Sequence, residues 1–167
     1  MEAPAKRDQT DAIDLLVLDH RRIERLAARL DTTLDPVETR SIFMQIVEQL
    51  AAHEAAEQQV IFPAFRAALE DADLTLAHRM GEHEELNELL AEMRTLAPGG
   101  LPFVKRESAF LLEIEEHFRR EEQSVFARMR GAFSADELAV LAAQMLDVKH
   151  HAPAFPDEHP RIKADHS

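Results

Sequence analysis

Cysteine, tryptophan and tyrosine are absent from this chain of 167 residues, and glycine occurs only four times. Without cysteine the protein has no disulfide framework, no thiolate zinc site and no cysteine nucleophile. Without tyrosine it has neither a tyrosinate ligand nor a tyrosyl radical. Most of the glycines and prolines fall at expected element boundaries, and this distribution favours long helices.

The sequence also has no long hydrophobic run. No stretch approaches the roughly 18 apolar residues of a membrane span, and the N-terminus has no apolar segment that resembles a signal peptide. We therefore expect a cytoplasmic protein with no membrane partner. The formal net charge of −13 argues against nucleic acid as a partner, because its phosphates are also negative. A protein partner stays unknown.

Apolar residues recur at the helical period along the whole chain, which predicts an all-α fold. We expect an antiparallel up-down four-helix bundle over residues 8–131, an additional helix packed on it over residues 132–149, and an extended, proline-rich tail over residues 150–167. The five expected helices cover approximately residues 8–30, 35–62, 71–96, 102–131 and 134–148.

Residues near the expected helix ends support these ranges. Asp8 or Thr10 can cap the first helix, and Asp35 can cap the second. Pro63 is expected to kink or end the second helix at the preceding residue. Gly81, inside the third helix, costs about 1 kcal/mol relative to alanine, which suggests close packing or local strain there.

One short motif occurs twice in the sequence. His53 and Glu57 recur as His117 and Glu121, 64 positions later (117 − 53). Residues four apart lie on one face of a helix, and the apolar periodicity places both pairs on the buried face. Each copy therefore presents an imidazole and a carboxylate together inside the bundle.

Two single histidines extend the repeat. His20 precedes His53 by 33 residues, and His83 precedes His117 by 34. The chain thus has the pattern of two helical hairpins related by a pseudo-two-fold axis. Such an axis would bring four histidines and two glutamates to one internal point.

The cost of burying charge favours metal ions at that point. An unpartnered buried carboxylate costs several kcal/mol, and no lysine or arginine lies on the inner stripes to neutralise the glutamates unless Arg79 reaches inward. Two cations would neutralise both carboxylates. Four nitrogens and two bridging carboxylates suit two iron ions, with manganese and zinc as rivals, and leave room for water, an oxo bridge, dioxygen or peroxide. The predicted ligands are His20, His53, Glu57, His83, His117 and Glu121.

Other polar residues were weighed as additional ligands and ranked below these six. Glu54 follows His53 and points about 100° around the helix, and Glu122 is placed similarly beside Glu121. His78 lies on another face than His83. A solvated role is expected for the histidines near the C-terminus, which are His150, His151, His159 and His166.

The pattern of His20, His53-x3-Glu57, His83 and His117-x3-Glu121, followed by Phe62-Pro63 and by Phe126, resembles the hemerythrin-like HHE cation-binding domain over approximately residues 10–130. The resemblance implies a non-haem di-iron centre that Glu57 and Glu121 bridge and the four histidines complete. It also implies O₂-related chemistry or sensing. Arg79 and Asn87 flank His83 where the oxygen-carrying hemerythrins have further ligand positions, and the four-His, two-Glu set is similar to that of bacterial iron-centre repair proteins.

Three functions are consistent with these observations. The first is a di-iron protein that binds, senses or reacts with O₂, NO or peroxide, or handles iron; whether it is an enzyme is left open. The second is a peroxide-dismutating enzyme, whose chemistry needs neither tyrosine nor cysteine. The third is a metal-free helical interaction module in which the buried polar residues only determine register.

Overall fold

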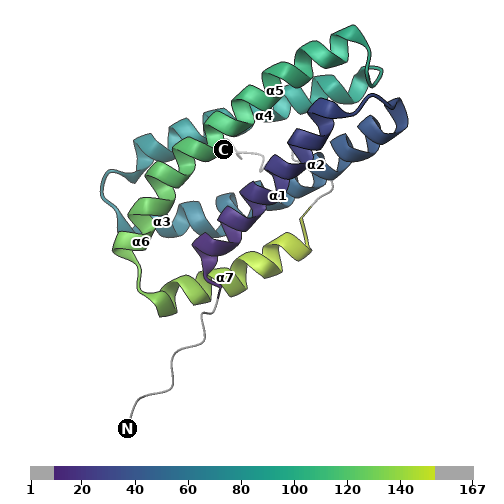
Figure 1. Ribbon diagram of the computed structural model, residues 1–167. Helices are drawn as coiled ribbons and strands as arrows, with labels where there is room; N and C mark the ends of the chain where they lie inside the picture. The colour runs from purple at the N-terminus through teal and green to yellow at the C-terminus, as the bar shows by residue number, and fades with distance from the viewer. Residues whose placement is uncertain (1–9, 153–167) are drawn as a thin grey trace, which may run out of the picture.

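The computed structural model describes residues 10–152, and these residues form helices and short connections with no strand. The all-α prediction is confirmed. Two π-helical turns interrupt otherwise continuous helices, so that α2, η1 and α3 form one rod and α5, η2 and α6 form another (Figure 1). The elements are α1 (Ala12–Thr32), α2 (Pro36–Ala56), η1 (Glu57–Ile61), α3 (Phe62–Ala68), α4 (Ala72–Thr95), α5 (Leu101–Glu121), η2 (Glu122–Phe126), α6 (Ala127–Ala132) and α7 (Ala135–His150).

The long helices form an antiparallel bundle of two hairpins. α1 packs along α2, and α4 packs along α5, as Figure 1 shows. α7 packs against α1, α2 and η1 on one side of the bundle. This arrangement agrees with the expected four-helix bundle and additional helix, and α7 extends to His150. Most of the expected tail lies outside the described residues.

The first helix begins later than expected. Asp11, rather than Asp8 or Thr10, is its N-cap: the Asp11 carboxylate accepts a hydrogen bond from the Asp14 amide at 2.9 Å, and the Asp14 carboxylate accepts one from the Asp11 amide at 3.2 Å. This reciprocal pair satisfies two backbone donors at the start of the helix. Asp35 caps α2 as predicted, since its carboxylate accepts from two backbone amides.

Of the two outcomes expected at Pro63, a kink or an end of the helix, the end does not occur, because the rod of α2, η1 and α3 continues through it. The chain passes through the π-helical turn η1 and continues helically to Ala68, and the Phe62 amide bonds to the Glu57 carbonyl five residues earlier. In the second copy of the repeat, Ala127 takes the position of Pro63, and the turn before it, η2, is also π-helical. The π turn therefore accompanies the repeat and does not depend on proline.

The core consists of two apolar clusters with a polar layer between them. One cluster, which includes Phe43, Phe103 and Phe110, joins the ends of the helices near the hairpin loops. The other, which includes Phe65 and Met145, joins the opposite ends of the helices with α7. The repeated histidines and glutamates lie between these clusters in the sequence of every long helix, so both sides of the polar layer are dry.

Gly81 does not have the surroundings that its position suggested. A Cβ atom built there meets nothing within 4 Å, and its backbone does not have a positive φ, unlike Gly99 at +76°. Neither close packing nor backbone strain therefore explains Gly81. Within residues 10–152, no helix is long and apolar enough to cross a membrane.

Candidate metal centre

The six predicted ligands converge in the polar layer. They come from five elements of the two hairpins, and each is at most 1% exposed. They are His20 on α1, His53 on α2, Glu57 at the start of η1, His83 on α4, and His117 and Glu121 on α5.

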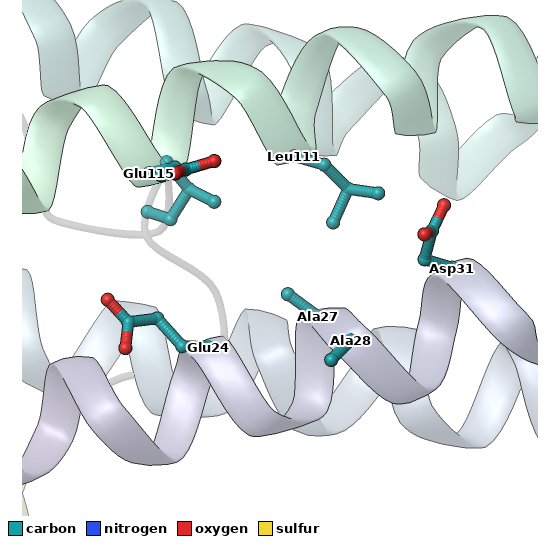
Figure 2. Close-up of a pocket in the computed structure, with 7 residues that line it drawn as sticks. Glu24, Ala27, Ala28, Asp31, Leu111 and Glu115 are labelled. Atoms are coloured by element: carbon teal, nitrogen blue, oxygen red, sulfur yellow. The ribbon is translucent and has the colours of Figure 1, made fainter.

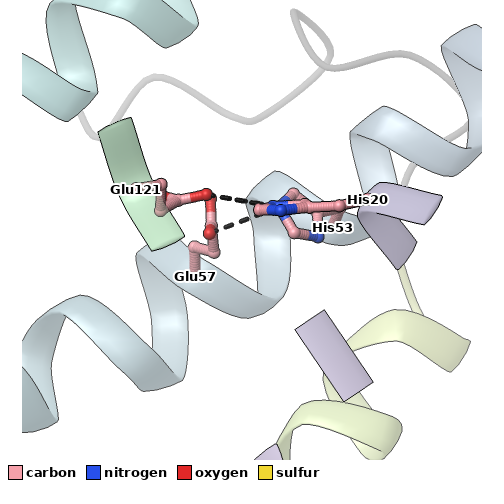
Figure 3. Close-up of side chains that lie close together, drawn as sticks. All are labelled: His20, His53, Glu57 and Glu121. Carbon is pink, nitrogen blue, oxygen red and sulfur yellow. Dashed lines mark hydrogen bonds and ion pairs between the residues drawn. The ribbon is translucent and has the colours of Figure 1, made fainter. Parts of the chain in front are cut away.

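Their side chains form two adjacent groups that share both glutamates. One group consists of His20, His53, Glu57 and Glu121; the other replaces the two histidines with His83 and His117. Within each group the available ligand atoms all lie within 4.8 Å of one another. Figure 3 shows the first group, with both carboxylates directed toward the two imidazole rings.

Each shared carboxylate lies between the two histidine pairs. Glu57 Oε1 is 3.3 Å from His53 Nε2, while Glu57 Oε2 is 3.1 Å from His83 Nε2. Glu121 Oε2 is 3.2 Å from His20 Nε2 and 3.7 Å from His117 Nε2. This is the arrangement of carboxylates that can bridge two cations.

Several of these buried atoms have no hydrogen-bond partner. Both carboxylate oxygens of Glu57, Oε1 of Glu121, and Nε2 of His83 and of His117 are in this state. A buried polar atom without a partner costs about 1–3 kcal/mol, and here five of them line the two groups. Two cations would satisfy all five, so the donor set fits a metal pair.

No basic side chain takes the place of such cations. In the described part of the chain, neither lysine nor arginine forms an ion pair with Glu57 or Glu121. Arg79 is buried, but its Nη2 lies 3.0 Å from Glu82 Oε1. The negative charge of the glutamates is thus offset within residues 10–152 by imidazoles alone.

The outward-facing nitrogens of two of the histidines meet carboxylates. His53 Nδ1 lies 3.2 Å from Asp19 Oδ2, and His117 Nδ1 lies 2.7 Å from Glu82 Oε2. Asp19 and Glu82 each precede a site histidine, so these two contacts are related by the internal repeat. A carboxylate at Nδ1 holds the proton there and leaves Nε2 free to bind a metal.

The other two histidines are held by residues that follow the two shared glutamates. His20 Nδ1 lies 2.8 Å from Glu122 Oε1, and the side-chain amide of Gln58 lies 3.3 Å from His83 Nδ1. In the sequence analysis, Glu122 is considered only as a possible ligand and Gln58 is not considered. Their common position, one residue after Glu121 or Glu57, is the signal that could have identified both.

The buried charges perturb one another. Burial alone would lower the pKa of His53 and of His83. The negative charge of Glu57 instead raises the pKa of His53 well above its usual value, and the negative charges of Glu54 and Glu57 raise the pKa of His83 to about 9. The pKa of Glu121 falls well below its usual range despite burial, because His117 and His20 lie beside it. A cation that binds here must displace protons from the imidazoles.

The lower-ranked candidates lie outside both groups. Glu54 is buried, its Oε2 accepts a hydrogen bond from Asn87 Nδ2 at 3.0 Å, and burial raises its pKa. His78 is exposed on α4, and His150 and His151 are exposed at the end of α7. The remaining two histidines, His159 and His166, lie outside the described residues.

Aromatic rings surround the site. The ring of Phe118 stacks on His20 with centroids 3.8 Å apart, and Phe126 lies against the same imidazole at 5.3 Å. Phe62 stacks on His83 at 5.7 Å. These rings pack the core and also form an apolar wall that limits the access of water to the ligands.

An acidic groove runs between α1 and α5 away from the site. Figure 2 shows Glu24, Asp31 and Glu115 around an apolar floor that includes Ala27 and Leu111. None of the six converging side chains lines this groove. The candidate site is therefore an internal one, distinct from this surface depression.

Comparisons with known proteins identify the family and the fold of the chain. The family model of the hemerythrin HHE cation-binding domain matches residues 11–108. The chain is 26% identical over 136 residues to a DNA nickase of Nostoc sp., covering 81% of this chain but only 38% of that protein. It is 22% identical over 153 residues to an uncharacterized hemerythrin-like protein of Schizosaccharomyces pombe, covering 88% of this chain and 75% of that protein.

A solved structure shares the fold. It is the crystal structure of a hemerythrin HHE cation-binding domain-containing protein from Mycobacterium kansasii, which superimposes with a TM-score of 0.76 at 19% sequence identity. The match covers 86% of this chain and 87% of the other. The order of the helices and the bundle architecture are thus those of a solved hemerythrin-like domain.

Proposed function

Because the chain belongs to the hemerythrin HHE cation-binding domain family, we propose that its six converging side chains hold two iron ions. Glu57 and Glu121 would bridge the ions, with His20 and His53 completing one position and the other two histidines completing the second. The observation that carries this proposal is the placement of Glu57, whose two oxygens face opposite histidine pairs at 3.3 and 3.1 Å.

The function we propose is the binding of, or reaction with, O₂, NO or peroxide at this centre. Two iron ions, when bound, supply Lewis-acid and redox chemistry, and six protein ligands leave positions open for a small molecule. The protein's own contribution is to hold the imidazoles in place through their Nδ1 partners and to exclude water with Phe118 and Phe126. Iron is preferred over manganese or zinc because mixed nitrogen and carboxylate ligation suits it and because of the family resemblance.

An anaerobic titration with Fe²⁺ tests this proposal. We expect two ions per chain and a rise in melting temperature, because metal binding stabilises the folded state. Separate additions of O₂, NO and peroxide should then change the optical spectrum of the loaded protein but not of the metal-free protein. Binding of no iron, with an unchanged melting temperature, would instead support a metal-free interaction module.

The peroxide experiment also separates a carrier or sensor from an enzyme. Dismutation converts two molecules of hydrogen peroxide into two of water and one of O₂, so an oxygen electrode measures it directly. Sustained oxygen evolution by the loaded protein would make it an enzyme. A spectral change without oxygen evolution would make peroxide, at most, a ligand.

We further propose that the protein acts in the cytoplasm and does not act on nucleic acid. The net charge of −13 supports the second point, because DNA repels an acidic surface. The Nostoc relative is called a DNA nickase, but this chain spans less than half of its length.

A further inference from the structure

In each half of the metal centre, Nδ1 of one histidine contacts a carboxylate, and these two contacts correspond in the internal repeat. Asp19 accepts from His53, and Glu82 accepts from His117. Both acceptors are carboxylates, and each also pairs with a basic side chain, Asp19 with Lys149 and Glu82 with Arg120. At this pair of positions the two halves are equivalent.

The second pair of positions breaks that equivalence. The His20 imidazole meets the Glu122 carboxylate at 2.8 Å, whereas the His83 imidazole meets the neutral amide of Gln58 at 3.3 Å. Glu122 and Gln58 follow the two bridging glutamates and correspond in the repeat. The half that contains His20 therefore has two outer carboxylates, and the half that contains His83 has one.

Basic side chains lie beside the outer carboxylates of both halves. Asp19 pairs with Lys149 and, at 3.8 Å, with Arg22, and Glu82 pairs with Arg79 and Arg120, both at 3.0 Å. Glu122 pairs with Arg21 at 2.7 Å. The difference between the halves therefore lies in the group that contacts Nδ1 of His20 or His83, and both halves have basic neighbours. Arg21 is 44% exposed, so water screens its effect on Glu122.

A carboxylate that accepts a hydrogen bond from Nδ1 makes Nε2 of the same imidazole a stronger metal ligand. Hydrogen bonds to a charged acceptor are roughly twice as strong as those between neutral groups, and they raise the basicity of a ligating imidazole. The Gln58 amide, whose Nε2 lies against His83 Nδ1, is neutral, so it does not raise the basicity of His83 in the way that a carboxylate does. Outer contacts of this kind typically change metal affinity by about 10–100-fold.

We propose that the two cation positions are inequivalent and that the position formed by His20 and His53 binds the first cation more tightly. This inference rests on the proposed two-metal function. The position of Glu54 favours the opposite order of binding, because this buried carboxyl lies near His83 and its Oε1 has no hydrogen-bond partner. If Glu54 became a ligand, the His83 and His117 position would fill first.

The test is a titration of the full chain with Co²⁺, which does not oxidise readily and reports coordination by visible absorption. The wild-type protein should bind two Co²⁺ ions in two resolved steps. Glu122→Gln should weaken the first step by about tenfold or more, and Gln58→Glu should strengthen the second by a similar factor. In both variants the two steps therefore approach each other.

Matched controls separate the contact from the change of charge. Glu115→Gln removes a carboxylate from the exposed surface of α5, and Gln59→Glu adds one at an exposed position beside Gln58. Both control variants should keep the separation of the wild-type steps. If they shifted the steps as the site variants do, general electrostatics would explain the effect and the proposed contact would not.

Two outcomes would overturn the inference while leaving the two-metal function intact. One is two equal steps in the wild-type protein; the other is a wider separation of the steps in Glu122→Gln and Gln58→Glu. Fewer than two Co²⁺ ions per wild-type chain would contradict the proposed function itself. If either variant misfolds, crystals of the wild type soaked with one equivalent of Co²⁺ decide the question, since the stronger anomalous peak should lie beside His20 and His53.

Discussion

At the scale of single residues, the proposed chemistry depends on two buried carboxylates that pair, within residues 10–152, with histidines and with no lysine or arginine. Glu57 is completely buried, and neither of its oxygens has a hydrogen bond. Its negative charge has a favourable environment only because imidazoles, and in our proposal two cations, surround it. Substitution of this residue is therefore the most direct probe of the site.

We predict that Glu57→Gln lowers the bound metal from two ions per chain to one or none. The amide is nearly the same size, but it lacks the charge and the second anionic oxygen that a bridge needs. Elemental analysis after anaerobic loading with Fe²⁺ measures the change. His78→Gln, on the exposed surface of α4, is the control and should keep both ions; retention of two ions by Glu57→Gln would show that this residue is no bridge.

A second buried carboxylate, Glu107 on α5, predicts a pH effect away from the metal. It is 8% exposed, and burial and the nearby charge of Asp31 raise its pKa above 4.5. The wild-type fold therefore loses stability as pH rises through that raised pKa, whereas glutamine stays neutral. Glu107→Gln should be more stable than wild type at pH 7, by about 1.4 kcal/mol for each unit of raised pKa.

The gain should disappear below about pH 4, where the carboxyl is protonated in both folded and unfolded chains. Urea unfolding of the metal-free protein at the two pH values measures it. Glu115→Gln, four residues from Leu111 on the rim of the acidic groove (Figure 2), should change little at either pH. An equal gain at both pH values would mean that the charge of Glu107 is not responsible.

At the scale of elements, α7 does more than cover the bundle. Its Lys149 bonds to Asp19 on α1, which in turn holds His53 on α2. The corresponding carboxylate in the other half, Glu82, receives its basic partners from α4 and α5. α7 therefore provides the Lys149 partner of Asp19 in one half of the site. In the other half, the arginine partners of Glu82 come from the bundle helices α4 and α5.

We predict that Lys149→Met destabilises the metal-free protein by about 1–3 kcal/mol. Removal of one partner from a buried pair leaves an uncompensated charge and costs about 3–5 kcal/mol; the partial exposure of Lys149, 19%, reduces that figure. Denaturant unfolding measures the loss. Lys105→Met, at an exposed position of α5, is the matched control, and equal stabilities of the two variants would remove the proposed role of Lys149.

Within α4, Gly81 offers a simple gain in stability. Because an added Cβ meets nothing within 4 Å, Gly81→Ala should stabilise the protein by about 1 kcal/mol through helix propensity alone. Gly99→Ala should do the opposite, since a φ of +76° disfavours residues with a side chain. Thermal unfolding compares the two; a loss of stability in Gly81→Ala would indicate that the glycine has a role in packing or motion.

At the scale of the whole molecule, the net negative charge argues against a role in DNA cleavage, which the name of one relative would suggest. The chain carries 32 acidic and 19 basic residues, and its relative in Nostoc is described as a DNA nickase. A two-metal site can cleave phosphodiesters in principle. The acidic surface, however, gives such a substrate no favourable field.

We therefore predict that the metal-loaded protein does not nick supercoiled plasmid DNA at low ionic strength, where electrostatic attraction would be strongest. Agarose gel electrophoresis distinguishes supercoiled from nicked circles. Glu57→Gln serves as the site-deficient control. Nicked circles that accumulate with wild type but not with this variant would overturn our expectation of no nucleic-acid partner.

The local order of residues was sufficient to predict the bundle and the six side chains that meet inside it. Helical periodicity and the repeated His-x-x-x-Glu spacing are properties of neighbouring residues, so they can be read without any knowledge of packing. The convergence of these six side chains followed because a repeat in sequence becomes a symmetry in space.

Only the tertiary structure decided what surrounds those six residues. The contact of His20 with Glu122 joins residues 102 positions apart, and that of Asp19 with Lys149 joins residues 130 apart. Such contacts depend on how whole helices pack, and one π turn begins at Glu57 and the other directly after Glu121. The sequence by itself determined which groups can bind metal, whereas the packing of distant helices decided how each half of the centre is held.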